Sequence, residues 1–461
     1  MPTRVGIVGG GILGTTLALR LAQAGARVTV LERAPSLGGV AGTMDFDGHV
    51  VDRFYHALTP ADERMLALAG ELGLSDAVRF SEVGAGFFVD GALHDLNGVA
   101  DFVRFGPLTP PQRARLAWFV AWCQVRSSYR GLDDLPLERW LVRHCGRAVT
   151  ERIWNPLLAS RFDGRYDELP ATYLWARTRR MSGARTGARR REEMGHLIGG
   201  HQRLIEAAAA RARELGVEIE LGAPVEGLAL EDGAVRGVVV GGEDRPFDTV
   251  IATLQPPALR RLLPPSLHGL LEAYPRRYLG VVCVVLKVRA SLTPYYAINV
   301  CEPTPITTVV ETSHVVGTDH TDGLRLVYLP KYCEPDAPEH TEPDDVVSER
   351  FEAMLARIVP GWHPGDVVSR TVQRAKVVEP VHASGARPRV APVWPGVPGL
   401  ALASAAQVYP RLLNGESVVA LAEDVAAQAA GRLGLDGGSA APRRRRRNTR
   451  LGERRAQVGS R

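Results

Sequence analysis

The feature that most constrains this chain is a glycine pattern close to its N-terminus. Gly9, Gly11 and Gly14 follow the apolar run 5–8, and residues 13–24 have helical periodicity. Gly9 permits a tight turn out of a strand, Gly11 lets the backbone approach a pyrophosphate, and Gly14 lets the helix pack closely on the sheet. The pattern predicts a strand–turn–helix unit that holds a dinucleotide phosphate at the helix N-terminus.

An acidic residue completes this unit. Glu32 ends the next strand-like run, 27–31, and Gly25 separates that run from the helix. A carboxylate at this position can accept hydrogen bonds from both ribose hydroxyls, and its charge repels a 2′-phosphate. The order of strand, glycine turn, helix and strand favours a dinucleotide site over an ordinary glycine-rich turn. Glycines inside the apolar run also disfavour a signal peptide.

The size and composition of the chain limit its class. At 461 residues it is too long for one compact core, so we expect two lobes. A hydrophobic content of 45% and a charged content of 23% are typical of a soluble globular enzyme. Five cysteines without a CxxC or Cys/His pattern disfavour zinc, iron–sulfur and disulfide scaffolds, and they indicate a reducing, cytoplasmic location.

The rest of the chain divides into helical and strand-like stretches. Residues 93–190 are mainly helical and rich in tryptophan and arginine. Further helices are predicted over 204–215, 346–358 and 417–433. Strands are predicted over 217–221, 249–253, 281–288, 306–311, 325–329 and 399–403, with a hairpin over 225–240.

The first glycine pattern is accompanied by three further matched places. A second glycine pair occupies 38–39, a strand begins at Val225, and the segment 414–417 opens the last helix. Together they resemble the amine oxidase superfamily of FAD-dependent flavoproteins, particularly its protoporphyrinogen oxidase-like and carotenoid desaturase-like branches. The resemblance covers residues 3–430. A nicotinamide-binding domain does not need a distant C-terminal strand and helix that rejoin it. The resemblance therefore favours FAD over NAD.

The resemblance implies a set of FAD contacts. The corresponding residues are Gly9, Gly11, Ile12, Leu13, Gly14, Glu32, Arg33, Gly38, Gly39, Arg53, Val225, Asn414, Gly415 and Ser417. One position departs from the family pattern, because Val40 follows the glycine pair where an arginine is usual. We expect Arg53 to supply that phosphate contact instead.

The resemblance also implies an α/β fold in which a Rossmann-like FAD-binding domain is discontinuous and a substrate domain is α+β. The expected parts of the FAD-binding domain are 1–80, 196–260 and 371–435. The substrate domain is expected to have a helical part, 81–195, and a sheet part, 261–370. Residues 436–461 contain five consecutive arginines and are expected to form a disordered basic tail.

Three residues are candidates for catalysis, and no metal site is expected. Lys287 corresponds to a lysine that some family members place near the flavin N5, although lysines on strands usually face solvent. His56 can line the flavin face or be a packed, hydrogen-bonded histidine. Tyr296, which follows the buried strand 281–288, can flank a substrate or belong to the core.

The expected activity is hydride transfer from a CH–CH or CH–NH group of a small or medium-sized metabolite to flavin N5. O2 or another acceptor would reoxidise the flavin. The alternative is a redox-neutral, flavin-dependent isomerase similar to UDP-galactopyranose mutase. Arginines are needed there to face a sugar diphosphate, and Arg161, Arg165 and Arg177 are the candidates.

Two sequence features bear on whether the chain also contacts membranes or nucleic acids. The arginine-rich tail is typical of a solubilising end, an anchor for anionic lipid or a nonspecific nucleic-acid contact. We favour the first, and we expect no specific nucleic-acid partner. Trp118 and Trp122 lie on one predicted helix, where core packing is the usual role and weak peripheral membrane contact is the alternative.

Overall fold

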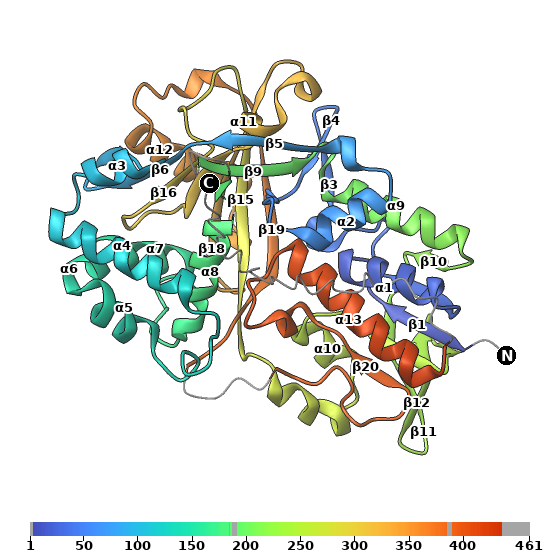
Figure 1. The fold of residues 1–461 in the computed structure, drawn as a ribbon. Coiled ribbons are helices and arrows are strands. Elements are labelled where there is room, and N and C mark those ends of the chain that lie inside the picture. The colour runs from blue at the N-terminus through green and yellow to red at the C-terminus, as the bar shows by residue number, and fades with distance from the viewer. Residues whose placement is uncertain (1–2, 184, 187–190, 385–389, 436–461) are drawn as a thin grey trace, which may run out of the picture.

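The computed structural model describes residues 3–183, 185–186, 191–384 and 390–435 (Figure 1). The expected basic tail, 436–461, lies outside the described residues. Within the described part of the chain, every helix is too short or too polar to cross a membrane.

One lobe is built on a parallel sheet of five strands in the order β10–β2–β1–β14–β20. Its strands are β1 (Arg4–Val8), β2 (Arg27–Glu32), β10 (Glu218–Leu221), β14 (Thr249–Ala252) and β20 (Leu400–Leu402). Each neighbouring pair is parallel. The sheet joins three stretches that are far apart in the sequence, which confirms the predicted discontinuous α/β fold.

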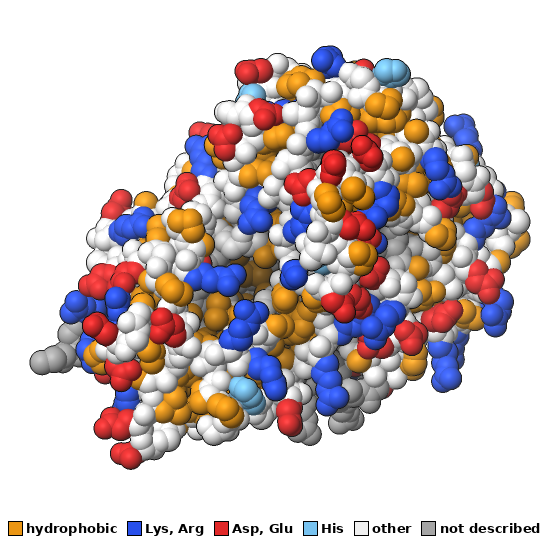
Figure 2. Space-filling view, turned by 180° about the vertical axis from the view of Figure 1, so that it is seen from behind, with side chains coloured by type: hydrophobic (Ala, Val, Ile, Leu, Met, Phe, Trp, Pro, Cys, Tyr) orange, Lys and Arg blue, Asp and Glu red, His pale blue; other side chains and the backbone are white. Residues whose placement is uncertain are grey.

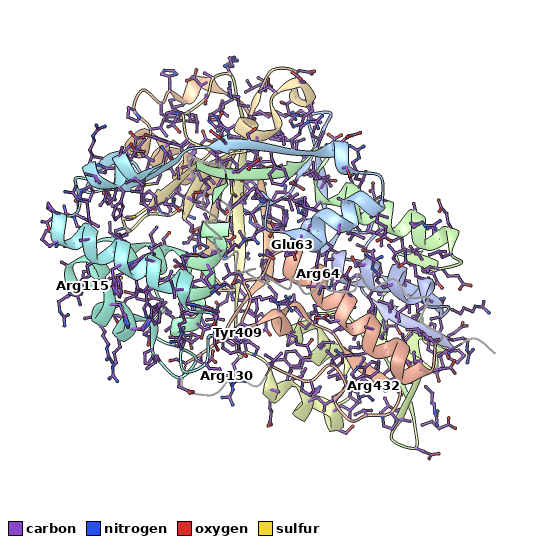
Figure 3. The ribbon with its side chains drawn as sticks, viewed as in Figure 1. Glu63, Arg64, Arg115, Arg130, Tyr409 and Arg432 are labelled. Carbon is purple, nitrogen blue, oxygen red and sulfur yellow. The ribbon has the colours of Figure 1, made fainter. Side chains whose placement is uncertain are left out.

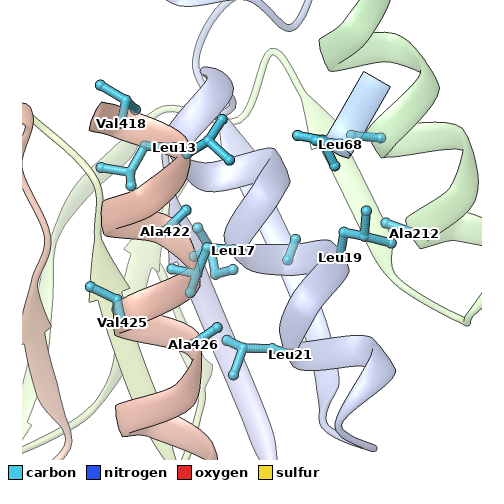
Figure 4. Packing of buried hydrophobic residues seen from close by; sticks show 14 of the residues in the cluster. Leu13, Leu17, Leu19, Leu21, Leu68, Ala212, Val418, Ala422, Val425 and Ala426 are labelled. Carbon is cyan, nitrogen blue, oxygen red and sulfur yellow. The ribbon is translucent and has the colours of Figure 1, made fainter. Parts of the chain in front are cut away.

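Helices cover one face of this sheet, and a small antiparallel sheet covers the other. The helices are α1 (Ile12–Gln23), α2 (Glu63–Glu71), α9 (Gly200–Glu214) and α13 (Gly415–Leu433). Leu17 and Leu21 of α1 share a core with Ala422 and Ala426 of α13, and the alanines let the two helices approach closely (Figure 4). The opposite face packs against β11 (Val225–Glu231), β12 (Ala234–Val240), β13 (Glu243–Pro246) and α10 (Pro256–Leu262).

The second lobe contains a seven-stranded sheet in the order β19–β15–β18–β17–β16–β6–β7. Its strands are β6 (Ala85–Val89), β7 (Ala92–Asp95), β15 (Arg277–Val288), β16 (Ala297–Val300), β17 (Thr308–Glu311), β18 (Arg325–Cys333) and β19 (Val367–Val381). Strand β15 is buried on both faces. Val282 and Val284 face α12 (Asp344–Ile358), whereas Val281 and Cys283 contribute to a core that borders the cavity described below.

A helical insertion lies beside this sheet (Figure 1). It contains α3 (Val99–Arg104), α4 (Pro110–Val125), α5 (Leu137–Cys145), α6 (Arg147–Val149), the π-helical η3 (Thr150–Trp154), α7 (Asn155–Arg161) and α8 (Ala171–Gly183). Phe119 is the centre of its core, with its ring centroid 4.9 Å from that of Trp140. Trp122 joins this core, but Trp118 is 65% exposed, so the core interpretation of the tryptophan pair is correct only for Trp122.

Short elements complete the fold. The strands are β3 (Thr43–Phe46), β4 (His49–Asp52), β5 (Val78–Val83), β8 (Arg185–Thr186) and β9 (Arg191–Leu197), and α11 spans Ser313–Val316. The 3₁₀ helices are η1 (Gly39–Ala41), η2 (Ser75–Ala77), η4 (Pro265–Ala273), η5 (Asp319–Thr321), η6 (Pro338–His340), η7 (Pro364–Asp366) and η8 (Ala405–Val408).

The strand β19 was not anticipated from the sequence. It falls largely within 371–435, where the third FAD-binding part was expected, and it pairs with β15 at the edge of the seven-stranded sheet. Its residues are mostly part-exposed and include Arg370, Arg374 and Lys376. An edge strand of this kind lacks the continuous apolar run that makes a buried strand recognisable.

Candidate functional site

The N-terminal glycines have different structural roles. Gly9 has a φ of +112°, and its N–H donates a hydrogen bond to the Leu31 carbonyl at 2.9 Å. A Cβ at Gly14 would lie 2.0 Å from the Gly9 carbonyl oxygen. At Gly11, however, a Cβ would meet only the Gly38 carbonyl oxygen, at 3.9 Å. Gly14 therefore serves helix packing, whereas Gly11 keeps the space before the helix N-terminus open.

The Glu32 carboxylate faces the same space. Its two oxygens accept hydrogen bonds from the N–H groups of Gly10, at 2.6 Å, and Ala34, at 2.8 Å. These bonds fix the side chain at the edge of the cavity. Because a carboxylate offers about four acceptor positions, Glu32 can still accept hydrogen bonds from a ligand's hydroxyls.

The second glycine turn packs directly on the first. The Gly38 N–H donates to the Gly10 carbonyl at 3.0 Å, and Gly38 and Gly39 have φ values of +129° and +60°. Arg53 is also on the cavity wall, where its Nε donates to Oε1 of Gln373 at 3.1 Å. This bond orients the guanidinium and leaves its terminal nitrogens for a ligand.

One cavity of about 2500 Å³ connects these turns to the second sheet. Ligand pockets are usually about 300–1,000 Å³, so this space can hold a large cofactor and a second molecule. The cofactor residues predicted from the sequence that line it are Gly9, Gly11, Ile12, Leu13, Glu32, Arg33, Gly38, Gly39, Arg53, Val225, Asn414 and Gly415. Figure 2 shows that one face of the molecule is hollowed, with hydrophobic side chains inside the hollow and cationic ones around it.

Two predicted cofactor residues lie behind the wall. Gly14 does not line the cavity, because it packs on Gly9. Ser417 is buried, and its N–H donates to Oδ1 of Asn414 at 2.8 Å. Asn414 thereby caps α13, so Ser417 acts through the shape of this helix start.

Two histidines and an aspartate gather beside the cavity. The ring centroids of His56 and His201 are 5.0 Å apart, and the backbone N–H of His201 donates to Oδ1 of Asp52 at 3.2 Å. Burial raises the pKa of Asp52 to about 7, lowers the pKa of His56 to about 4 and lowers the pKa of His201 well below its usual value. Both imidazoles are therefore neutral at pH 7.

The same three residues are the one group of metal-ligand types that comes together among the described residues. Their ligating atoms lie within 4.8 Å of one another. The sequence had predicted no metal site. The Nδ1 atoms of His56 and His201 are buried and lack a partner in the described part of the chain. His56 therefore lines the cavity with one ring nitrogen unpaired among the described residues, and its contact with the flavin face stays a prediction.

Tyr296 is both a core residue and a cavity-lining residue, the two alternatives that the sequence left open. Its ring is 4% exposed and packs with Val281 and Cys283, yet it also lines the cavity. Its hydroxyl is hydrogen-bonded to Nε2 of His196 at 2.8 Å. Burial lowers the pKa of His196 to about 3, so this pair is uncharged at neutral pH.

Lys287 lies away from the cavity. Its side chain is only 1% exposed, so the solvent-facing alternative is wrong. The ammonium donates to the Phe46 carbonyl and to Nδ1 of His49 at 2.7 Å, both in the β3–β4 hairpin. Because β15 is covered on both faces, a lysine on it must find partners inside the protein. This placement does not support the predicted approach to the flavin.

The three arginines considered for an isomerase are separated. Arg161 and Arg177 line the cavity, whereas Arg165 lies outside it and pairs with Glu334 at 3.5 Å. The Arg161 guanidinium pairs with Glu379 at 2.8 Å and lies over the Tyr332 ring, 3.4 Å from its centroid. Two of these three candidates therefore lie in the cavity wall, and Arg161 is paired with a carboxylate.

Sequence reasoning missed Asp52, His196 and His201. A signal for His201 was available, because Gly199 and Gly200 precede it at the start of α9, with φ values of +84° and +75°. A Cβ at Gly200 would lie 2.5 Å from Oδ1 of Asp52. A third glycine pair before a helix thus marks a close approach between chain segments. No comparable signal identifies His196, because only the tertiary fold brings β9 to Tyr296.

Residues 14–409 match the family model described as flavin containing amine oxidoreductase. The chain belongs to this family. This flavin amine oxidoreductase is 25% identical to 15-cis-phytoene desaturase of Arabidopsis thaliana over 287 residues, which are 57% of the chain and 50% of the plant protein. It therefore spans about half the length of that relative.

Solved structures share the fold of this flavin amine oxidoreductase. A putative protoporphyrinogen oxidase from Exiguobacterium sp. 255-15 has a TM-score of 0.70 and 22% identity, covering 94% of this chain and 99% of that one. A reduced UDP-galactopyranose mutase has a TM-score of 0.68 and 14% identity, covering 94% of each chain. At these identities the likeness establishes the fold, and family membership establishes a flavin as the cofactor class.

Proposed function

We propose that this chain is an FAD-dependent oxidoreductase acting on a CH–CH or CH–NH group of a small or medium-sized, largely apolar metabolite. One observation carries the proposal. A single cavity joins the glycine turns before α1 to a second chamber between the helical insertion and the seven-stranded sheet. Such a space suits a dinucleotide at one end and its reaction partner at the other.

The residues present fit FAD. The open position at Gly11 and the start of α1, where the first N–H groups have no intrahelical partner, suit a pyrophosphate. The adjacent Gly38–Gly39 turn, which is bridged to Gly11, suits it as well. Glu32 and Val225 line the cavity at the end where an adenosine would lie. An adenosine half is present in FAD and absent from FMN, so these residues favour FAD.

The second chamber favours an apolar substrate. Its lining includes Phe87, Phe102, Leu116, Val120, Leu157 and Leu174. Side chains of this kind exclude water and bind a substrate through its apolar surface. We infer that polar selectivity comes from Tyr296 and Arg177, which line the same cavity.

The glycine turns and Glu32 would hold the FAD, which would supply a two-electron acceptor for a substrate C–H bond, with O2 or another acceptor as the final oxidant. His56 and His201 are neutral, so each can donate or accept a hydrogen bond to a bound group. Asp52 holds the backbone at His201 and thereby positions that imidazole. Tyr296 and His196 form a fixed, uncharged section of the wall.

A second candidate is a redox-neutral isomerase similar to UDP-galactopyranose mutase. Arg161 and Arg177 in the cavity wall favour it, because guanidinium groups bind phosphates well. The pairing of Arg161 with Glu379 reduces the positive charge available to a diphosphate. This pairing makes the oxidoreductase the better-supported function.

An anaerobic screen distinguishes the two functions. The oxidised protein is mixed with apolar amines and with compounds that can be desaturated, and the flavin absorbance is followed. Bleaching by one class, reversed by O2 or an artificial acceptor, is the expected result. Conversion of UDP-galactopyranose by pre-reduced protein, with no bleaching by any candidate in the screen, would instead establish the isomerase.

A further inference from the structure

Four apolar side chains are exposed on two neighbouring helices of the insertion. Val99 and Val103 on α3 are 83% and 60% exposed, and Trp118 and Val125 on α4 are 65% and 85% exposed. We call these four residues the α3–α4 face. A large aromatic ring and three β-branched residues in water are unfavourable unless something covers them.

The α3–α4 face continues into the rim of the cavity. Val99 on α3 and Ala117 and Ala121 on α4 are exposed and also line the cavity. Phe102 and Val120, on the inner sides of the same helices, line it more deeply. The cavity therefore reaches the surface beside the exposed apolar side chains.

The insertion that bears this face has a net positive charge, whereas residues 1–98 and 181–435 together have a net negative charge. Residues 99–180 contain 14 arginines and 8 acidic residues, a net charge of +6. Residues 1–98 and 181–435 together contain 33 basic and 41 acidic residues, a net charge of −8. Four of these arginines pair with carboxylates outside the insertion, namely Arg152, Arg161, Arg165 and Arg180. The smaller positive excess that remains favours an anionic surface.

Cationic side chains lie close to the exposed apolar ones. Arg104 ends α3, and Arg115 lies on α4, where it is one turn before Trp118. The guanidinium of Arg115 donates to the carbonyls of Arg143 and His144, both at 2.8 Å, so its charge is held at the outer side of the insertion (Figure 3). An apolar patch with adjacent arginines matches the boundary between lipid headgroups and acyl chains.

We propose that the α3–α4 face docks on an anionic lipid surface. Trp118 and the three valines enter the headgroup boundary, and the neighbouring arginines remain at the level of the lipid phosphates. The contact is interfacial, since the described helices cannot span a bilayer. The contact brings the rim of the cavity to the membrane. The docking does not depend on which reaction the cavity supports.

The first test measures binding of the purified full-length holoprotein to sedimenting vesicles. Vesicles of phosphatidylcholine alone are compared with vesicles that also contain phosphatidylglycerol. We expect binding that requires phosphatidylglycerol and weakens with salt. In the variant W118S/V125S, the partition coefficient should fall on the order of tenfold, since two inserted apolar side chains are lost. The matched control V346S/V368S changes two exposed valines of α12 and β19 and should bind like the wild type.

The second test locates the inserted residue. Brominated acyl chains should quench tryptophan fluorescence in the wild type, and quenching should fall in W118F while vesicle binding is retained. Unchanged vesicle binding by W118S/V125S would overturn the proposal and assign any lipid contact to other arginines, including those of the tail. A dimer in solution that W118S/V125S dissociates would also overturn it, because a second copy would then cover the face.

Discussion

The phenol oxygen of Tyr296, the residue just before β16 of the large sheet, lies 2.8 Å from Nε2 of His196 on β9 of a small sheet. Both side chains are buried, and Tyr296 also forms part of the cavity wall. This hydrogen bond ties the small sheet containing β9 to the large sheet at the point where a substrate would lie.

Replacing Tyr296 should therefore affect both stability and reaction. In Tyr296→Phe, the buried His196 nitrogen loses its partner, which should cost about 1–3 kcal/mol of unfolding free energy. In Tyr296→Ala, the cost should rise to about 3–5 kcal/mol because a cavity forms. Flavin reduction by substrate should slow in both variants. Denaturant unfolding and stopped-flow reduction measure the two effects, and a normal reduction rate in Tyr296→Ala would remove this residue from the site.

Two glycines of one turn should respond differently to the same substitution. In Gly11→Val the side chain points into open space, so folding should persist while flavin is lost. In Gly14→Val the side chain meets the Gly9 carbonyl oxygen, so folding itself should fail or weaken by several kcal/mol, on the order of 3. Circular dichroism and the absorbance of bound flavin separate these outcomes. Full flavin content in a folded Gly11→Val protein would contradict the proposed pyrophosphate position.

The role of Lys287 is predicted to be structural. In Lys287→Met, the Phe46 carbonyl and the His49 ring lose a charged donor, and the melting temperature should fall by an amount that corresponds to about 1–3 kcal/mol. Flavin content and the rate of flavin reduction should stay near those of the wild type. A large loss of reduction rate in a stably folded variant would return Lys287 to the reacting site.

The half-buried Asp52 carboxyl should make stability depend on pH. Its pKa in the folded protein is about 7, above the ordinary value of 3.8, so the folded state binds more protons between these pH values. Its contribution to stability therefore falls as pH rises through this window, whereas those of His56 and His201 change in the opposite direction. Asp52→Asn removes only the first effect. The melting temperature of Asp52→Asn minus that of the wild type should increase from pH 5 to pH 8, and a constant difference would show that Asp52 is ionised throughout.

Much of the nucleotide-binding lobe could be predicted because its signals are local. Gly9 and Glu32 belong to one continuous unit in which each turn, helix and strand has its own sequence pattern, and β1, α1 and β2 formed where expected. The cavity wall could not be predicted in the same way. Lys287 lies on a strand whose burial depends on α12 and on the β3–β4 hairpin, and His196 reaches Tyr296 only through tertiary packing. Periodicity reports which face of an element is buried, but it does not report which distant element covers that face.

The central claim is that the cavity holds FAD through noncovalent contacts. The most direct measurement is to denature the purified protein, separate the released cofactor by chromatography and compare its amount with the amount of protein. The account predicts a yellow protein that releases one FAD per chain, because all five cysteines are buried with raised pKa values. Of the five, Cys283 lines the cavity, on β15 of the seven-stranded sheet and not in the glycine turns. A colourless protein that FAD cannot reconstitute, or a flavin that stays attached to the denatured chain, would contradict it.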